Sequence, residues 1–304
     1  MGKKKKNFNW AKYEKGRDDE IRKLAELLKA IIWELGEPYK MKREGKGRPY
    51  YPPKGMAIVA ILMFRMSLSE REYVNWLKTN VWLIDLAELP NPPDRRSIKR
   101  VFERTPEEYW EKLEEKIQRL IPDSKVYGVD STGLKQSKRT GAWSEKKNRR
   151  KDFKKLHIIA DLLNRAIVVQ KLTEGRRHDS PVFGEMMDDV ESVDKMAGDP
   201  AYLSRNNCDI VASKGGKSYF KPKKNVTAKP KGSQSWKDMI MEWLENPRKF
   251  LREYHVRSII EAIIWSFKCV VGDIVRCRKN KNILLEIILK KCVFNAVWYV
   301  RRCL

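Results

Sequence analysis

Four side chains near the C-terminus have types and spacing that suit a metal ion held beside phosphate groups. They are Tyr254, Arg257, Glu261 and Lys268, separated by 3, 4 and 7 residues. At about 100° per residue in an α-helix they fall within an arc of about 60°, and Trp265 falls about 20° from Tyr254 at the edge of that arc. A carboxylate between two cations suits a metal ligand flanked by phosphate-binding groups. The alternative is the solvated face of an ordinary amphipathic helix, where a tryptophan is unusual.

Two aspartates each follow a short apolar segment that reads as a strand. Residues 126–129 lead into Asp130, and residues 195–197 lead through a glycine into Asp199. An acid at the C-terminal end of a central strand is well placed to point into a cleft. Each residue also has a simpler interpretation, because aspartate is common in turns and caps and Asp199 precedes a proline.

The charge of the chain is far from balanced and predicts a polyanionic partner. Its 304 residues contain 65 Lys and Arg against 40 Asp and Glu, a net charge of +25. Nucleic acid is the commonest polyanion that such a field attracts, ahead of a merely solubilising surface or a membrane surface. Most of the excess lies after residue 124, so we expect the strongest polyanion binding there.

The elements that must position these residues change character near residue 124. Residues 1–124 show helical periodicity and helix-start signals at Ser69 and Asp94, which predict an all-helical N-terminal domain. Residues 125–304 predict an α/β domain with a mixed sheet and late helices, interrupted by a short basic insertion at about 214–249. The expected strands cover 126–130, 156–161, 166–172, 195–197 and 209–213, and the expected helices of this domain cover 181–190, 254–271 and 283–301.

Together these motifs resemble those of a known family over roughly residues 90–300. The Tyr-x2-Arg-x3-Glu-x6-Lys spacing is similar to the Y-R-E-K signature of DDE-type insertion-sequence transposases. Three further segments resemble the family's first-Asp, second-Asp and Gly-x-x-His-Asp elements: Val129-Asp130-Ser131-Thr132, Gly198-Asp199-Pro200-Ala201-Tyr202 and Gly175-Arg176-Arg177-His178-Asp179-Ser180.

The resemblance implies a fold, an activity and a cofactor. The fold would be RNase H-like, an α/β mixed sheet flanked by helices, here preceded by the all-helical domain. The activity would be metal-dependent cleavage at transposon ends followed by strand transfer into target DNA. Asp130, Asp199 and Glu261 would hold two Mg²⁺ ions, with Mn²⁺ as a substitute and with Asp130 bridging the pair. Tyr254, Arg257 and Lys268 would hold phosphates of the transposon end.

Further residues are predicted to contact DNA or support the site. The basic cluster at 135–155 includes Lys146, Lys147, Arg149 and Arg150, and the predicted helix after Asp94 starts with Arg95 and Arg96. Either set has a solvated surface as its alternative. Trp236, in the basic insertion, resembles an aromatic residue that stacks a flipped base in some relatives, although burial is the competing interpretation. His178 and Asp179 would support the catalytic residues, whereas His157 and His255 are expected to be structural.

Two other functions compete with transposition, and the compartment can be predicted. An RNase H-like DNA nuclease without strand transfer would use the same triad, and a DNA-binding protein derived from a transposable element would not need it. The transposase interpretation also implies a homodimer on paired double-stranded DNA ends. Five cysteines without a Cys-x-x-Cys pair, and the lack of a long apolar run, predict a cytoplasmic protein with no membrane span.

Overall fold

The computed structural model describes residues 10–41, 51–136, 153–175 and 177–303, with side chains from Asp19 onward. The chain forms two compact units. The first contains the residues up to Leu120 together with those from Ile288, and the second runs from Ile121 to Ile287. The last helix is continuous across this division, so the first unit is built from both ends of the chain.

The first unit is helical, as predicted. Its helices are α1 (Trp10–Leu35), α2 (Pro53–Met66), α3 (Glu70–Thr79), α4 (Val81–Leu86), α5 (Arg95–Arg104), α6 (Glu107–Arg119) and most of α13 (Asn280–Cys303). The predicted starts of α3 and α5 are confirmed. Ser69 forms a capping box with Glu72, and Asp94 accepts a hydrogen bond of 2.7 Å from the Ser97 amide. Helix α2 is buried along Met56–Leu62 and forms the centre of this unit.

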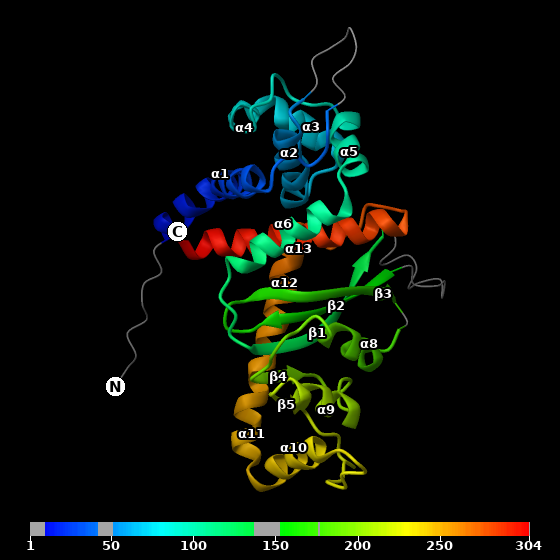
Figure 1. The fold of residues 1–304 in the computed structure, drawn as a ribbon. Coiled ribbons are helices and arrows are strands. Elements are labelled where there is room, and N and C mark those ends of the chain that lie inside the picture. The colour runs from blue at the N-terminus through cyan, green and yellow to red at the C-terminus, as the bar shows by residue number, and fades with distance from the viewer. Residues whose placement is uncertain (1–9, 42–50, 137–152, 176, 304) are drawn as a thin grey trace, which may run out of the picture. The chain divides into compact units, whose positions relative to one another are not determined.

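The second unit is built on a five-stranded mixed sheet (Figure 1). Its strands are β1 (Val126–Lys135), β2 (Phe153–Asp161), β3 (Ala166–Glu174), β4 (Lys195–Gly198) and β5 (Lys217–Phe220), in the order β3-β2-β1-β4-β5. The pairs β1–β2 and β2–β3 are antiparallel, whereas β4 is parallel to both β1 and β5. This order and these directions are those of the RNase H-like fold, so the predicted fold class is confirmed.

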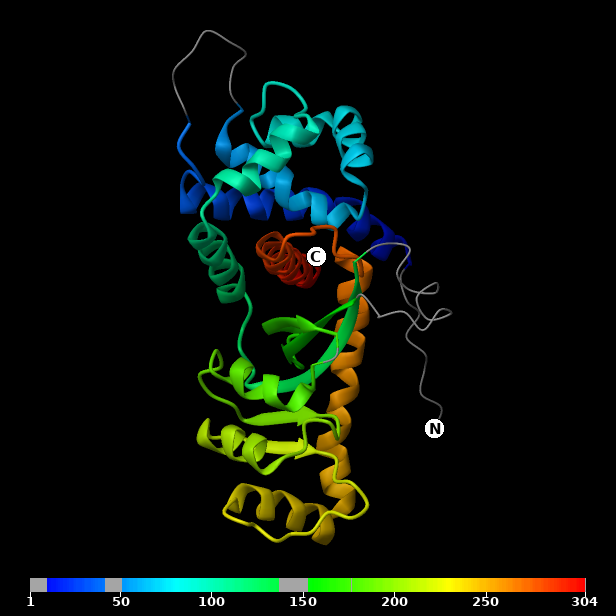
Figure 2. The same ribbon diagram turned by 90° about the vertical axis from the view of Figure 1, so that its right-hand side faces the viewer.

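The helices of the second unit are α8 (Asp179–Met187), α9 (Arg205–Ser213), α10 (Gln234–Glu245), α11 (Pro247–Tyr254), a 3-10 turn η1 (His255–Arg257) and α12 (Ser258–Val271). Helix α12 packs against β1, and α11 packs against β4 and β5 (Figure 2). The predicted continuous helix 254–271 is therefore wrong at its start, where η1 interrupts the helix. The basic insertion contributes β5 and α10 to the same core as the sheet, so it is not a separate subdomain.

One predicted strand is also wrong. Residues 209–213 belong to α9, because Ser204 caps that helix by accepting from the Asn207 amide at 3.1 Å. Cys208 and Val211 then lie three residues apart on its buried face. The fifth strand is β5, which follows α9 and was not predicted. No helix in the described part of the chain is both long and apolar enough to cross a membrane.

Candidate active site

The two aspartates lie where the parallel pairing of β1 and β4 stops. The last pair in the register is Val129 with Gly198, and Asp130 and Asp199 directly follow these two residues. We predicted that this strand would end at Asp130. Strand β1 instead continues to Lys135, because β2 still pairs with it on the side away from β4. Pairing with β2 therefore fixes the backbone of Asp130, and the end of the pairing with β4 leaves space beside its carboxylate.

Glu261 reaches the same edge because α12 approaches β1 closely. A Cβ atom added to Gly128 would lie 3.3 Å from Cβ of Ile260 and 2.7 Å from a methyl group of Leu162. Only glycine allows this approach. Since side chains alternate along a strand, Asp130 and Gly128 face the same side of the sheet, where α12 packs. Glu261 follows Ile260 and is brought beside Asp130.

Arg257 connects two of the three carboxylates. Its Nη1 lies 3.7 Å from Oδ2 of Asp130, and its Nη2 donates to Oε1 of Glu261. Burial raises the pKa of Asp130, and the charges of Asp199 and Glu261 raise it further, while the Ser131 amide and Arg257 act in the opposite direction. The three carboxylates thus share one electrostatic environment, and a single guanidinium incompletely neutralises it.

The donor set fits divalent metal ions by its chemistry. The three carboxylates supply only hard oxygen ligands, which Mg²⁺ prefers. The Arg257 guanidinium occupies the side of Asp130 and Glu261 where a cation is needed, and so stands in for one. As the side chains of the described residues lie, no three His, Cys, Asp or Glu residues are grouped closely enough to hold an ion.

A buried hydroxyl lies among the same carboxylates. Tyr202 is 1% exposed, and its hydroxyl lies beside the Ser131 side chain. Burial raises its pKa, and the charges of Asp179, Asp130 and Asp199 add to the effect, while the hydrogen bond with Ser131 acts in the opposite direction. The raised pKa favours the protonated hydroxyl, which can donate a hydrogen bond.

A buried histidine was missed as part of this region. His157 of β2 faces Ser131 across the β1–β2 pair and is fully buried. Its Nε2 lies 2.8 Å from the Thr173 hydroxyl, its Nδ1 lies 3.2 Å from Asp179, and Lys155 contacts the same aspartate at 2.8 Å. Burial lowers the pKa of His157 to about 4, so the ring is neutral at pH 7. The strand register next to Asp130 was the signal that could have located it.

Of the two predicted supporting residues, only Asp179 points inward. It is the acceptor of the cluster just described, and its side chain is 17% exposed. His178 is exposed at the start of α8 and makes no side-chain capping bond there.

The predicted polar face of the late helix is only partly realised. Tyr254 ends α11, is 8% exposed and belongs to the core of the second unit. Arg257, Glu261 and Lys268 do follow one another along η1 and α12. Burial lowers the pKa of Lys268, with Lys135 acting in the same direction and Asp273 opposing it. Trp265 is 70% exposed on α12, one turn after Glu261.

The other predicted DNA contacts have different outcomes. Trp236 is 6% exposed, and its Nε1 donates to the Thr227 carbonyl at 3.0 Å. The ring is therefore buried, which agrees with the competing interpretation and not with base stacking. Arg95 and Arg96 are exposed at the start of α5, with Arg95 lying 3.7 Å from Glu70. Four predicted contacts lie outside the described residues: Lys146, Lys147, Arg149 and Arg150.

Comparisons with known proteins give a similar solved structure and two matching family models. A solved structure, described as the cryo-EM structure of piggyBac transposase synaptic complex with hairpin DNA, is similar with a TM-score of 0.45 and 11% sequence identity. The match covers 93% of this chain and 72% of that one. A search of curated proteins gives no significant match. Residues 8–104 match the family described as Transposase domain (DUF772). Residues 121–296, more than half of the chain, match the family described as Transposase DDE domain, and the chain therefore belongs to the DDE transposases.

Proposed function

We propose that this chain cuts DNA at transposon ends and joins the ends to target DNA, with Asp130, Asp199 and Glu261 as its catalytic residues. The observation that carries the proposal is the convergence of three carboxylates beside an arginine. The two aspartates follow adjacent parallel strands, α12 brings Glu261 to them, and Arg257 contacts Asp130 and Glu261. The family supports the reaction class that we propose, and this geometry supports the choice of residues.

Two divalent ions, Mg²⁺ or Mn²⁺, would supply activation of the attacking oxygen and stabilisation of the leaving 3′-oxygen when bound. Asp130 would hold both ions, and Asp199 and Glu261 would hold one each. The environment of Asp130 suits this role, because burial and two neighbouring carboxylates make its charge costly unless cations are close. Tyr202, whose proton is retained, can hold a carboxylate oxygen in place by donating to it.

The cations of η1 and α12 would bind the DNA strand that is cut. Arg257 presents a planar fork that can contact two phosphate oxygens, so a phosphate can replace the carboxylates it now contacts. Lys268, half-buried two turns after Glu261, offers a point charge to the next phosphates. We keep Tyr254 in the proposal only as a support beneath Arg257, since its ring is buried.

The first unit would contribute to recognition of duplex DNA. Arg95 and Arg96 are exposed in the first turn of α5, where the helix dipole disfavours cations. A phosphate backbone there would offset that cost. The segment carrying Lys146, Lys147, Arg149 and Arg150 would add positive charge for DNA binding. We further propose that two copies act on paired ends, and that they act in the cytoplasm, which suits five free cysteines.

The decisive experiment measures Mg²⁺-dependent nicking of duplex DNA that carries the element's end. Asp130→Asn should lower the rate by about 100-fold or more, because the charge that holds the cations is lost. Asp189→Asn, at an exposed position, is the matched control and should retain the wild-type rate. Equal nicking by Asp130→Asn and wild type would overturn the assignment of Asp130.

A second measurement separates transposition from simple nuclease activity. A pre-cut end with a free 3′-hydroxyl is incubated with a supercoiled plasmid, and joined products are counted. Transposition predicts joined products that depend on Asp130, Asp199 and Glu261. Nicking without any joining would refute strand transfer and leave a nuclease.

A further inference from the structure

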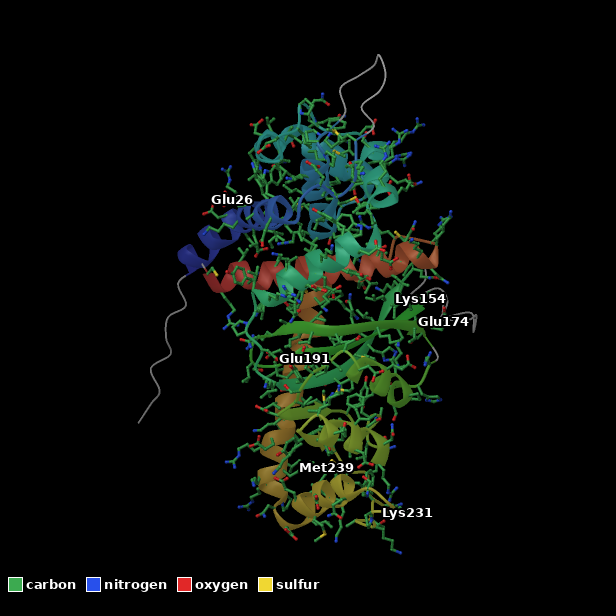
Figure 3. All side chains as sticks on the ribbon, in the orientation of Figure 1. Glu26, Lys154, Glu174, Glu191, Lys231 and Met239 are labelled. Atoms are coloured by element: carbon green, nitrogen blue, oxygen red, sulfur yellow. The ribbon has the colours of Figure 1, made fainter. Side chains whose placement is uncertain are left out.

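A lysine-rich loop lies in the second unit between β5 and α10, and neither the catalytic site nor the predicted DNA contacts include it. We call residues 221–231 the lysine loop. It contains five lysines in eleven positions and no acid: Lys221, Lys223, Lys224, Lys229 and Lys231. All five are exposed, and Figure 3 shows Lys231 at the margin of the unit, away from the strands. No ion pair joins any of them to another described residue.

The lysine loop is fixed rather than loose. Arg205 of α9 donates to the carbonyl oxygens of Pro230 and Lys229, each at 3.0 Å, and its guanidinium lies 4.6 Å from the centre of the Trp236 ring. Trp236 in turn donates to the Thr227 carbonyl at 3.0 Å. These contacts hold the loop backbone at Thr227, Lys229 and Pro230.

The side chains of the lysine loop divide into an inner and an outer set. Pro222 is buried, and Val226 and Ala228 pack against the core of the second unit. The lysines point outward between these anchors. Asp209 of α9 accepts hydrogen bonds from the hydroxyls of Ser233 and Ser235, which follow the loop, and no ion pair joins it to a loop lysine. The fold thus holds five like charges together without neutralising them.

Such an arrangement needs a partner of opposite charge. Like charges this close repel one another, since screening at about 0.1 M salt extends over about 10 Å. A merely solubilising surface does not require an ordered, acid-free loop. Ordering the backbone beforehand also lowers the entropy cost of binding. Lysine provides a point charge that suits phosphate oxygens, and contacts to phosphates do not depend directly on base sequence.

We propose that the lysine loop binds the phosphate backbone of target DNA, independently of its sequence. This inference rests on the proposed function, because only strand transfer requires a second duplex. A transposon end must be recognised by its sequence, whereas a contact made by lysines alone suits the duplex that receives it. Trp236 then has a role that differs from base stacking, since it holds the loop that carries the lysines.

The first test is the salt dependence of binding to a random-sequence duplex. A variant with all five lysines changed to glutamine should bind more weakly, and its slope of log affinity against log salt should fall by roughly 2 to 4. The matched control changes five exposed lysines outside the loop and outside α5 to glutamine: Lys23, Lys40, Lys78, Lys112 and Lys125. Its slope should stay closer to that of wild type. An equal slope for the loop variant and wild type would overturn the proposal.

Thermal unfolding without DNA separates a binding role from damage to the fold. Removing unpaired like charges should raise the melting temperature of the loop variant while its DNA binding falls. A lowered melting temperature would mean that the lysines serve the fold, and the proposal would then be wrong. Arg205→Gln keeps all five lysines but releases the loop, and it should weaken duplex binding more than Lys40→Gln, which loses the same charge.

The plasmid-joining assay tests the choice of partner. Joining should fall by at least about tenfold in the loop variant, and nicking of end DNA is read in parallel. A parallel fall in nicking would show that the loop holds the transposon end, which contradicts the assignment to target DNA. A wild-type protein that neither nicks nor joins would refute the proposed function, whereas the salt slope would still test the loop.

Discussion

Glu20 in the first unit and Asp130 in the second are both carboxylates removed from water, but their surroundings are opposite. The side chain of Glu20 is 2% exposed and contacts two guanidinium groups, Arg65 Nη2 and Arg301 Nε, each at 2.6 Å. The side chain of Asp130 is 20% exposed, has one guanidinium at 3.7 Å and lies near two further carboxylates.

The two carboxylates differ in how far the protein itself neutralises their charge. Burial alone would raise the pKa of Glu20, yet the hydrogen bonds and charges of Arg301 and Arg65 hold it below its usual value. The pKa of Asp130 is instead raised. Two guanidinium groups neutralise Glu20, whereas one neutralises Asp130 only in part, which agrees with the metal-binding role that we propose for it.

The largest effect on stability is expected for Glu20, whose charge two guanidinium groups neutralise. Glu20→Ala should lower the free energy of unfolding by about 3 kcal/mol or more, because two guanidinium groups lose their partner in a largely buried place. Denaturant unfolding measures this change. The exposed Glu26→Ala is the matched control on the same helix, and it should change stability by less than about 0.5 kcal/mol. Similar losses in both variants would remove Glu20 from its structural role.

A smaller effect on stability, of opposite sign, is expected for Asp130. Asp130→Asn should raise the free energy of unfolding without metal by about 1 kcal/mol, because it removes a charge that is costly in its surroundings. Addition of Mg²⁺ should raise the melting temperature of wild type and have less effect on the variant. A destabilised Asp130→Asn would show that Arg257 already satisfies this carboxylate.

The smallest effect is a difference in the pH dependence of stability. The pKa of Glu20 is below its usual 4.5, so its contribution is present above that pH and is lost as pH falls through the lowered value. The pKa of Asp130 is above its usual 3.8, so stability is gained below that pH and lost as pH rises through the raised value. The free energy of unfolding is measured against pH for wild type, Glu20→Gln and Asp130→Asn. Subtracting each variant from wild type should give two difference curves with slopes of opposite sign. Slopes of the same sign would contradict the comparison.

Features encoded by neighbouring residues could be predicted from the sequence, and those decided by distant contacts could not. The capping residues Ser69 and Asp94 were found because their partners lie three residues away. Strand β5 and the helix α9 before it were missed or misassigned, because their states depend on pairing with β4 and on burial of Cys208.

The candidate site shows the same division. The strands that lead to Asp130 and Asp199 and the helical setting of Glu261 followed from local patterns. The burial of Tyr254 and Trp236 did not, because it depends on a core assembled from the sheet, α10 and α11. The inward position of His157 depends on a register between strands that no local pattern reveals.

The contribution of α13 to the first unit also bears on how the chain is made. Arg301 contacts Glu20, Lys291 contacts Glu114 and Asn295 contacts Gln118, so residues synthesised after the sheet contact helices synthesised before it. During translation, Glu20 has only Arg65 as its partner until α13 has left the ribosome. The order of synthesis therefore keeps the helical unit incomplete until the strands of the second unit have emerged.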